Sequence, residues 1–233
     1  MTRLADFPIT RRWPPQNPEA IQLYSFPTPN GVKVSIALEE MGLPYDAHTV
    51  SFATQDQMSE AFLSLAPNNK IPAIIDPDGP GGAPLPLFES GAILLYLAEK
   101  TGQLIGTFPQ DRWQITQWLM FQMGGIGPMF GQVGFFHAFA GKEIEDDRPR
   151  KRYYDEAARL LRVLDGQLAG KDWIHGAYSI ADIAICPWLR TMRDFYKAGD
   201  HVGWDGLQNV PGYLDRFLDR PAVQRGLVQP PRE

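Results

Sequence analysis

The strongest constraint on the fold is a change of pattern along the chain. Apolar runs typical of strands alternate with helix-forming stretches over residues 20–101, whereas only helical patterns remain from residue 109 onward. The predicted strands occupy residues 21–26, 47–50, 71–76 and 87–88. The predicted helices among them occupy residues 31–41, 58–65 and 90–101.

The order of these elements, β-α-β-α-β-β-α, is that of a thioredoxin-like domain. Its first three elements form a βαβ unit, in which the two strands are parallel. We therefore predict an α/β thioredoxin-like domain over residues 20–102 and an all-α helical bundle domain over residues 109–226. In this division, residues 1–19 form an N-terminal arm and residues 227–233 a C-terminal tail.

The helical half carries three local signals. The sequence GGIGP at residues 124–128 interrupts an apolar stretch and is expected to kink or break a helix. Residues 150–168 have apolar side chains at three- and four-residue steps, which predicts an amphipathic helix. Ser179 and Asp182 resemble a capping box, so a further helix is predicted to begin there.

Composition argues against several classes of protein. The 233-residue chain has a net charge of −5, which disfavours nucleic-acid binding, and it has no apolar run of the roughly 18 residues that span a membrane. Residues 1–18 lack the apolar core of a secretory signal. Cys186 is the single cysteine, which excludes an intrachain disulfide and predicts a reducing, cytoplasmic environment. The four histidines are scattered, so no metal site is expected.

The turn after the first predicted strand, at residues 25–31 (SFPTPNG), is the first candidate site. A thioredoxin-like domain would have its redox Cys-x-x-Cys pair here, but this turn contains no sulfur. It offers the Thr28 hydroxyl, the Asn30 amide and the N–H groups of a helix start, which together suit an anion. A free thiol is only about 3% ionised at pH 7. Such donors therefore suit a thiolate carried by a ligand; the alternative is that Thr28 and Asn30 only cap the helix.

Two later segments carry other ligand-binding signals. Pro72 opens a strand that should be central, where a residue without an N–H group is unexpected. This predicts a cis Ile71–Pro72 bond and a main chain at Ile71 that pairs with an extended peptide. The alternative is that Pro72 is an ordinary loop proline. Ser90 is a suitable first residue for a helix whose N-terminus binds a ligand carboxylate, and Glu89 beside it could bind a ligand ammonium. The alternative is that Ser90 only caps the helix and that Glu89 is a solvent-exposed acid. Together the three segments match the thiolate, the backbone and the amino-acid terminus of glutathione.

Four stretches of the chain together resemble glutathione transferases. They are residues 23–31 (LYSFPTPNG), 67–74 (PNNKIPAI), 87–98 (LFESGAILLYLA) and 179–184 (SIADIA). The resemblance covers about residues 20–225 and is greatest to the bacterial Nu class, which is related to the yeast nitrogen-regulatory prion protein. No counterpart is assigned to the N-terminal arm.

The resemblance implies a homodimer in which glutathione binds in a cleft between the two domains. It implies that Thr28 and Asn30 take the place of the Tyr, Ser or Cys that activates the glutathione thiol in other classes. It also implies that Arg152 of the helical domain closes over the ligand. The Nu class is similar in holding two glutathione molecules, or glutathione disulfide, in each site.

The same resemblance assigns the remaining glutathione contacts. Gln57 matches the glutamine that holds the glutathione backbone, Lys70 lies beside the site, and the Ile71 main chain pairs with the cysteinyl part. Glu89 and Ser90 match the γ-glutamyl site. These assignments are expectations that come from the motifs.

The expected chemistry is thiol–disulfide exchange, in which bound glutathione attacks a disulfide. The alternatives are glutathione conjugation of small electrophiles and a non-catalytic glutathione-binding regulator. Tyr24 and Ser25 compete with Thr28 for the role of catalytic hydroxyl.

Overall fold

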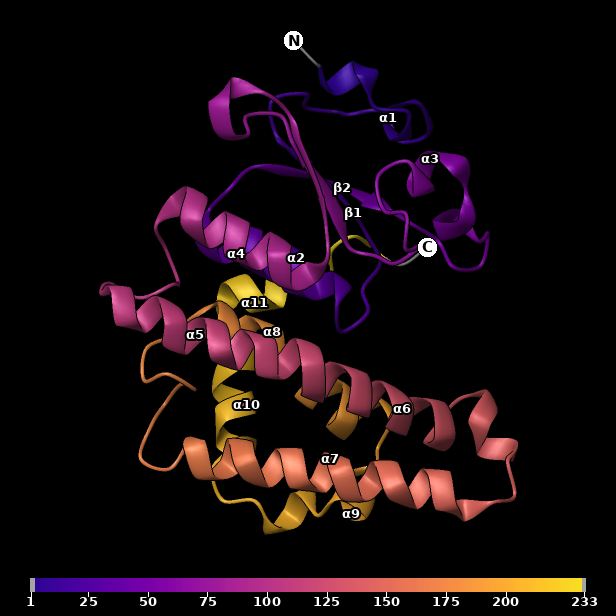
Figure 1. The fold of residues 1–233 in the computed structure, drawn as a ribbon, viewed down its shortest axis with the longest axis vertical. Coiled ribbons are helices and arrows are strands. Elements are labelled where there is room, and N and C mark those ends of the chain that lie inside the picture. Colours follow the sequence, from indigo (N-terminus) through magenta and orange to yellow (C-terminus); the bar gives the residue numbers. More distant parts are fainter. Residues whose placement is uncertain (1–2, 232–233) are drawn as a thin grey trace. The chain divides into compact units, whose positions relative to one another are not determined.

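The computed structural model describes residues 3–231 and separates the chain into two units (Figure 1). Unit 1 comprises the residues up to Gln103 together with those from Pro221 onward, and unit 2 comprises Leu104–Arg220. Within residues 3–231, none of the helices combines the length and the hydropathy that a membrane crossing requires.

Unit 1 is built on a four-stranded sheet in the order β2-β1-β3-β4. Its strands are β1 (Ile21–Ser25), β2 (Tyr45–Thr49), β3 (Ala73–Asp76) and β4 (Leu85–Phe88). Its helices are α1 (Ile9–Arg12), α2 (Gly31–Met41), α3 (Glu60–Leu63), α4 (Ser90–Thr101) and α11 (Pro221–Gly226). Strands β1 and β2 are parallel and the other two pairs are antiparallel, which confirms the predicted thioredoxin-like order.

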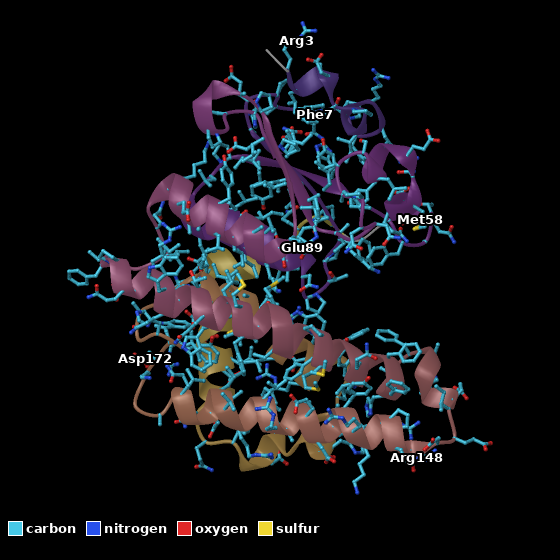
Figure 2. The ribbon with its side chains drawn as sticks, viewed as in Figure 1. Arg3, Phe7, Met58, Glu89, Arg148 and Asp172 are labelled. Carbon is cyan, nitrogen blue, oxygen red and sulfur yellow. The ribbon has the colours of Figure 1, made fainter. Side chains whose placement is uncertain are left out.

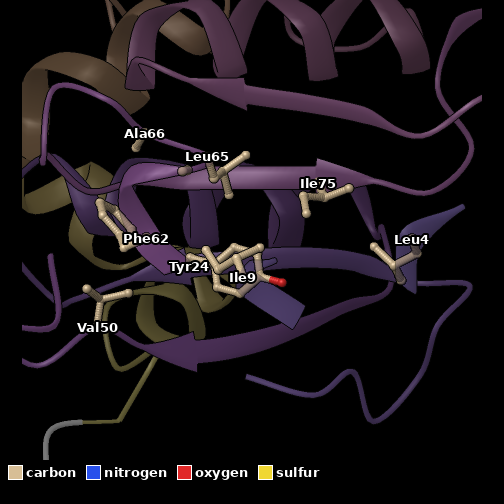
Figure 3. Packing of buried hydrophobic residues seen from close by; sticks show 9 residues of the cluster. Leu4, Ile9, Tyr24, Val50, Phe62, Leu65, Ala66 and Ile75 are labelled. Carbon is tan, nitrogen blue, oxygen red and sulfur yellow. The ribbon is translucent and has the colours of Figure 1, made fainter. Parts of the chain in front are cut away.

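One face of this sheet is covered by the N-terminal arm and by the segment around α3. Tyr24 of β1 and Ile75 of β3 point to this face, where they pack with Phe62 of α3 and with Leu4 and Ile9 of the arm (Figure 3). The arm, for which the sequence assigned no role, therefore contributes to the buried core of unit 1.

The opposite face of the sheet is covered by α2 and α4, which lie side by side (Figure 1). Leu23 and Ile74 point to it, because side chains alternate along a strand, and both are fully buried. Helix α11, which the sequence did not predict, packs on α2: Ser35 donates a hydrogen bond of 2.7 Å to the Gly226 carbonyl oxygen. A Cβ atom at Gly226 would lie 2.6 Å from the Cα of Ile36, so only glycine permits this close contact.

Unit 2 is helical throughout its regular structure. Its helices are α5 (Pro109–Phe121), α6 (Gly127–His137), α7 (Asp147–Gln167), α8 (Ile180–Arg190), α9 (Gly199–Val202) and α10 (Val210–Leu218). Of the two outcomes expected at residues 124–128, a kink or a break, the break does not occur: a π-helical turn at Gln122–Ile126 interrupts the α-helical pattern and joins α5 to α6 with helical backbone angles. This wider turn accommodates Pro128, which has no N–H group to donate to the preceding turn.

The predicted capping box at the start of α8 is confirmed. Ser179 accepts the N–H of Ala181, and the Asp182 carboxylate accepts both the N–H and the hydroxyl of Ser179 at 2.8 and 2.9 Å. The same buried carboxylate also accepts the N–H of Ile174 at 2.9 Å and the hydroxyl of Tyr213 at 2.8 Å. Asp182 thus joins three segments of unit 2 through four donors.

Candidate functional site

The candidate segments of unit 1 meet at one edge of the sheet. The strand register aligns Tyr24 of β1 with Ala73 of β3, and Ala73 with Phe88 of β4. Because β3 is antiparallel to both neighbours, the chain leaves β1 and β4 at the same edge where it enters β3. The turn at residues 26–30, the loop before β3 and the start of α4 therefore lie next to one another.

Thr28 and Asn30 lie in the half-buried turn between β1 and α2. The Thr28 side-chain oxygen accepts the N–H of Gly31 at 3.1 Å, so this residue does cap the helix. A hydroxyl has one donor and two acceptor positions, so the cap leaves the O–H of Thr28 able to donate to an incoming sulfur. Asn30 is the residue immediately before α2 and has helical backbone angles.

This turn is compact because a glycine follows it. A Cβ atom at Gly31 would lie 1.9 Å from the Phe26 carbonyl oxygen and 2.6 Å from the Ser25 hydroxyl. The close approach brings the first turn of α2 against the end of β1, with its N–H groups at the sheet edge.

The two competing hydroxyls are buried. Tyr24 is fully buried and stacks on His48 with 4.8 Å between ring centroids, and its hydroxyl has no hydrogen-bond partner among the described residues. Burial raises the pKa of Tyr24, which keeps it protonated. Ser25 is also fully buried, and its hydroxyl points to the Phe26 carbonyl oxygen at 3.5 Å. Of the three hydroxyls, only that of Thr28 belongs to a partly exposed residue.

The loop before β3 has the backbone that the sequence predicted at Pro72. The Ile71–Pro72 peptide bond is cis, and β3 begins only at Ala73 rather than at residue 71. Within residues 3–231 the main-chain N–H and C=O of Ile71 make no hydrogen bond, so both groups are available to an extended ligand. Lys70 is exposed beside them. Asn69 has a positive φ of 52°.

Gln57 lies in a 3-10 turn at Asp56–Met58, which follows β2. The Asn69 amide donates a hydrogen bond of 3.2 Å to the sulfur of Met58, so this turn is joined to the loop before β3. The side-chain oxygen of Gln57 is buried without a hydrogen-bond partner among the described residues. An unsatisfied buried acceptor costs about 1–3 kcal/mol.

Glu89 and Ser90 form the start of α4. Glu89, which is labelled in Figure 2, is exposed and has φ 73° and ψ 111°. This conformation costs a non-glycine residue roughly 1 kcal/mol or more, and such strain often marks a functional position. Ser90 is buried, and its hydroxyl oxygen lies 3.4 Å from the ammonium nitrogen of Lys33.

Lys33 is a functional candidate that the sequence analysis missed. It is fully buried, and desolvation lowers the pKa of its ammonium group to about 7, while the negative charge of Glu89 opposes this shift. Its signal in the sequence was a single lysine inside the apolar helix segment at residues 31–38. Below a pH of about 7, where Lys33 is protonated, its ammonium adds a positive charge behind the helix N-terminus that Ser90 begins.

Arg152 and Cys186 of unit 2 differ in exposure. Arg152 is exposed on α7, and its contact with a ligand stays a prediction. Cys186 is fully buried in α8, and burial raises the pKa of its thiol, so it is not a nucleophile. Among residues 3–231, no three His, Cys, Asp or Glu side chains gather around a possible metal site.

Comparisons with known proteins show the family to which the chain belongs. Residues 28–100 match the family model described as glutathione S-transferase, N-terminal domain. The disulfide-bond oxidoreductase YfcG of Escherichia coli is 47% identical over 211 residues, which are 90% of this chain and 95% of that protein.

Two crystal structures are more similar still. A glutathione transferase from Pseudomonas putida, with one glutathione disulfide bound per subunit, is 65% identical with a TM-score of 0.96 over 97% of this chain and 98% of its own. A glutathione transferase from Burkholderia graminis, with two glutathione molecules bound per subunit, is 62% identical with a TM-score of 0.97 over 100% of this chain and 98% of its own. The chain therefore belongs to the glutathione transferase superfamily and, within it, to the YfcG type.

Proposed function

We propose that this enzyme binds glutathione at the sheet edge of unit 1 and uses the glutathione thiol to reduce disulfides. The observation that carries the proposal is the turn before α2, which is where a thioredoxin-like domain would have its redox cysteine pair. In this turn the Thr28 side-chain oxygen accepts the N–H of Gly31, so its O–H is able to donate to a ligand sulfur. The buried Cys186 offers no alternative sulfur. The glutathione disulfide and the glutathione pair in the two related crystal structures are the product and the reactants of such a reaction.

Thr28 and Asn30 stabilise the thiolate of bound glutathione in this proposal. Lowering the thiol pKa by two units from its ordinary value near 8.5 requires about 2.7 kcal/mol. Two side-chain donors and the N-terminus of an 11-residue helix are sufficient, since hydrogen bonds to a charged group contribute about 1.5–3 kcal/mol each.

The remaining predicted residues hold the rest of the tripeptide. The Ile71 main chain pairs with the cysteinyl residue in the manner of an added strand, beside Gln57 and Lys70. Ser90 and the α4 N-terminus bind the γ-glutamyl carboxylate, while Glu89 binds its ammonium.

The reaction proceeds in two exchanges. The first glutathione thiolate attacks one sulfur of the substrate disulfide, forming a mixed disulfide and releasing a thiolate that takes up a proton. A second glutathione thiolate attacks the glutathione sulfur of the mixed disulfide, giving glutathione disulfide and the second thiol. Two glutathione thiols are oxidised, one substrate disulfide is reduced, and no sulfur of the chain takes part.

Family resemblance adds further parts to this proposal. Arg152 closes over the bound ligand, and the active form is a Nu-class homodimer in the cytoplasm. Size-exclusion chromatography with light scattering tests the dimer, and the effect of Arg152→Ala on glutathione affinity tests the contact.

Glutathione-dependent reduction of 2-hydroxyethyl disulfide tests the main proposal. Thr28→Ala is expected to lower kcat/KM about 100-fold, which corresponds to the loss of about 2.7 kcal/mol, and to raise the pKa of the bound thiol. Thr28→Ser retains the hydroxyl and should recover most of the activity, while Thr107→Ala at an exposed threonine of unit 2 serves as the control.

Each other result has a definite meaning. Wild-type protein that binds glutathione but does not turn over the disulfide would be a binding protein rather than a reductase. Turnover of chlorodinitrobenzene alone would indicate conjugation. Full activity of Thr28→Ala would refute the assigned role of Thr28.

A further inference from the structure

The N-terminal arm is tied to the turn that carries Gln57. Arg12, the last residue of α1, donates a hydrogen bond to the carboxylate of Asp56, which immediately precedes Gln57. The same carboxylate accepts the N–H of Ser51 at 3.1 Å and the hydroxyl of Thr54 at 3.0 Å. Asp56 is nearly buried, so these three donors largely fix its side chain.

The main chain of Asp56 is held as well. Its N–H donates to the Ser51 carbonyl oxygen at 2.9 Å, and its own carbonyl oxygen accepts the N–H and the hydroxyl of Ser59 at 3.0 and 2.7 Å. Because Gln57 follows Asp56 directly, a change in the backbone angles of Asp56 changes the direction in which Gln57 points.

The guanidinium of Arg12 is itself held in place by the arm. It lies 5.0 Å from the ring centroid of Trp13, whose indole N–H donates to the Thr49 carbonyl oxygen at 3.0 Å. Ile9 of the same short helix is fully buried in the core cluster. A side chain fixed before it binds loses little conformational entropy when it forms an ion pair.

We infer that Arg12 is a positioning residue of the glutathione site, which holds Asp56 so that Gln57 faces the backbone of the bound tripeptide. The inference rests on the proposed function. It gives the N-terminal arm a role in ligand affinity in addition to its role in the core. The buried side-chain oxygen of Gln57, which has no partner among the described residues, is the group whose orientation matters.

Calorimetric titration with glutathione tests this inference through a double-mutant cycle. Arg12→Ala is expected to weaken glutathione binding about fivefold, the cost of one misplaced hydrogen bond. In a Gln57→Ala background the same change should have almost no effect, because Arg12 acts through Gln57. Arg12→Lys should recover part of the affinity. The matched control is Arg11→Ala, an exposed arginine one residue earlier that should bind glutathione as the wild type does.

The same variants give a kinetic readout. Arg12→Ala should raise the KM for glutathione and leave kcat nearly unchanged, because the sulfur contacts at Thr28 are intact. Should Arg12→Ala fail to fold, Arg12→Gln replaces it in both arms of the cycle.

The outcomes separate the inference from the function on which it rests. Equal affinities for Arg12→Ala and Arg11→Ala would overturn the inference, as would an Arg12 effect that persists in full without Gln57. Failure of the wild-type protein to bind glutathione would instead refute the proposed function.

Discussion

Replacing the buried Lys33 by methionine is expected to change the pH dependence of stability. The pKa of this ammonium is about 7 in the folded protein, against an ordinary value of 10.5, chiefly because the group is desolvated. Between these two values the unfolded chain holds a proton that the folded chain has released. The free energy of unfolding of the wild type therefore rises with pH across this window.

The size of the effect follows from the two pKa values of Lys33. Each pH unit contributes at most about 1.4 kcal/mol, and less near pH 7, where the folded protein is only partly deprotonated. From pH 7 to pH 9 the wild type should gain about 2 kcal/mol relative to Lys33→Met. Below pH 7 the contribution levels off, because folded and unfolded chains then both hold the proton.

Urea denaturation at pH 6, 7, 8 and 9 measures this difference. Other titrating groups affect both proteins alike, so the difference between their curves isolates Lys33. Lys151→Met, at an exposed lysine on α7, should run parallel to the wild type. Parallel curves for the wild type and Lys33→Met would show that the ammonium is not desolvated in the way the structure implies.

Three further substitutions have definite expected results. Gly31→Ala places a Cβ atom 1.9 Å from the Phe26 carbonyl oxygen and should abolish glutathione binding in calorimetry by displacing the turn, with a loss of stability. Asp182→Asn retains volume but disrupts a buried carboxylate with four donors, and should lower the free energy of unfolding by about 3 kcal/mol in urea. Ser35→Ala removes the hydrogen bond to Gly226 and should lower that free energy by about 1 kcal/mol, with no change in kcat.

Much of unit 1 was predictable because its boundaries are marked by local chemistry. Gly42 and Gly102 both have the positive φ angles that end helices, so α2 and α4 end where predicted. Pro72 has the cis bond that its place at the start of a strand suggested. Local signals of this kind depend on a few neighbouring residues and are therefore readable without the fold.

Features that depend on tertiary packing were not predictable. Glycine and proline at residues 124–128 favour a break locally, yet Ile126 is fully buried and the chain remains helical there. At the candidate site, the proposal of Thr28 comes from its motif. Lys33 gains its significance only from its proximity to Ser90, 57 positions later in the sequence. The pairing of arm and turn, across 44 positions, likewise has no local signature.

The contact of α11 with α2 has a consequence for biosynthesis. Residues 221–226 belong to unit 1 but leave the ribosome only after all of the helical unit has been made. The nascent α2 surface around Ile36 therefore stays uncovered until residues 221–226 have been made, whereas the helical unit has its full set of residues earlier. A nascent chain that ends at Arg220 and is held on the ribosome by an unrelated linker long enough to clear the exit tunnel should thus have a helical unit that resists protease and a thioredoxin-like unit that is cleaved.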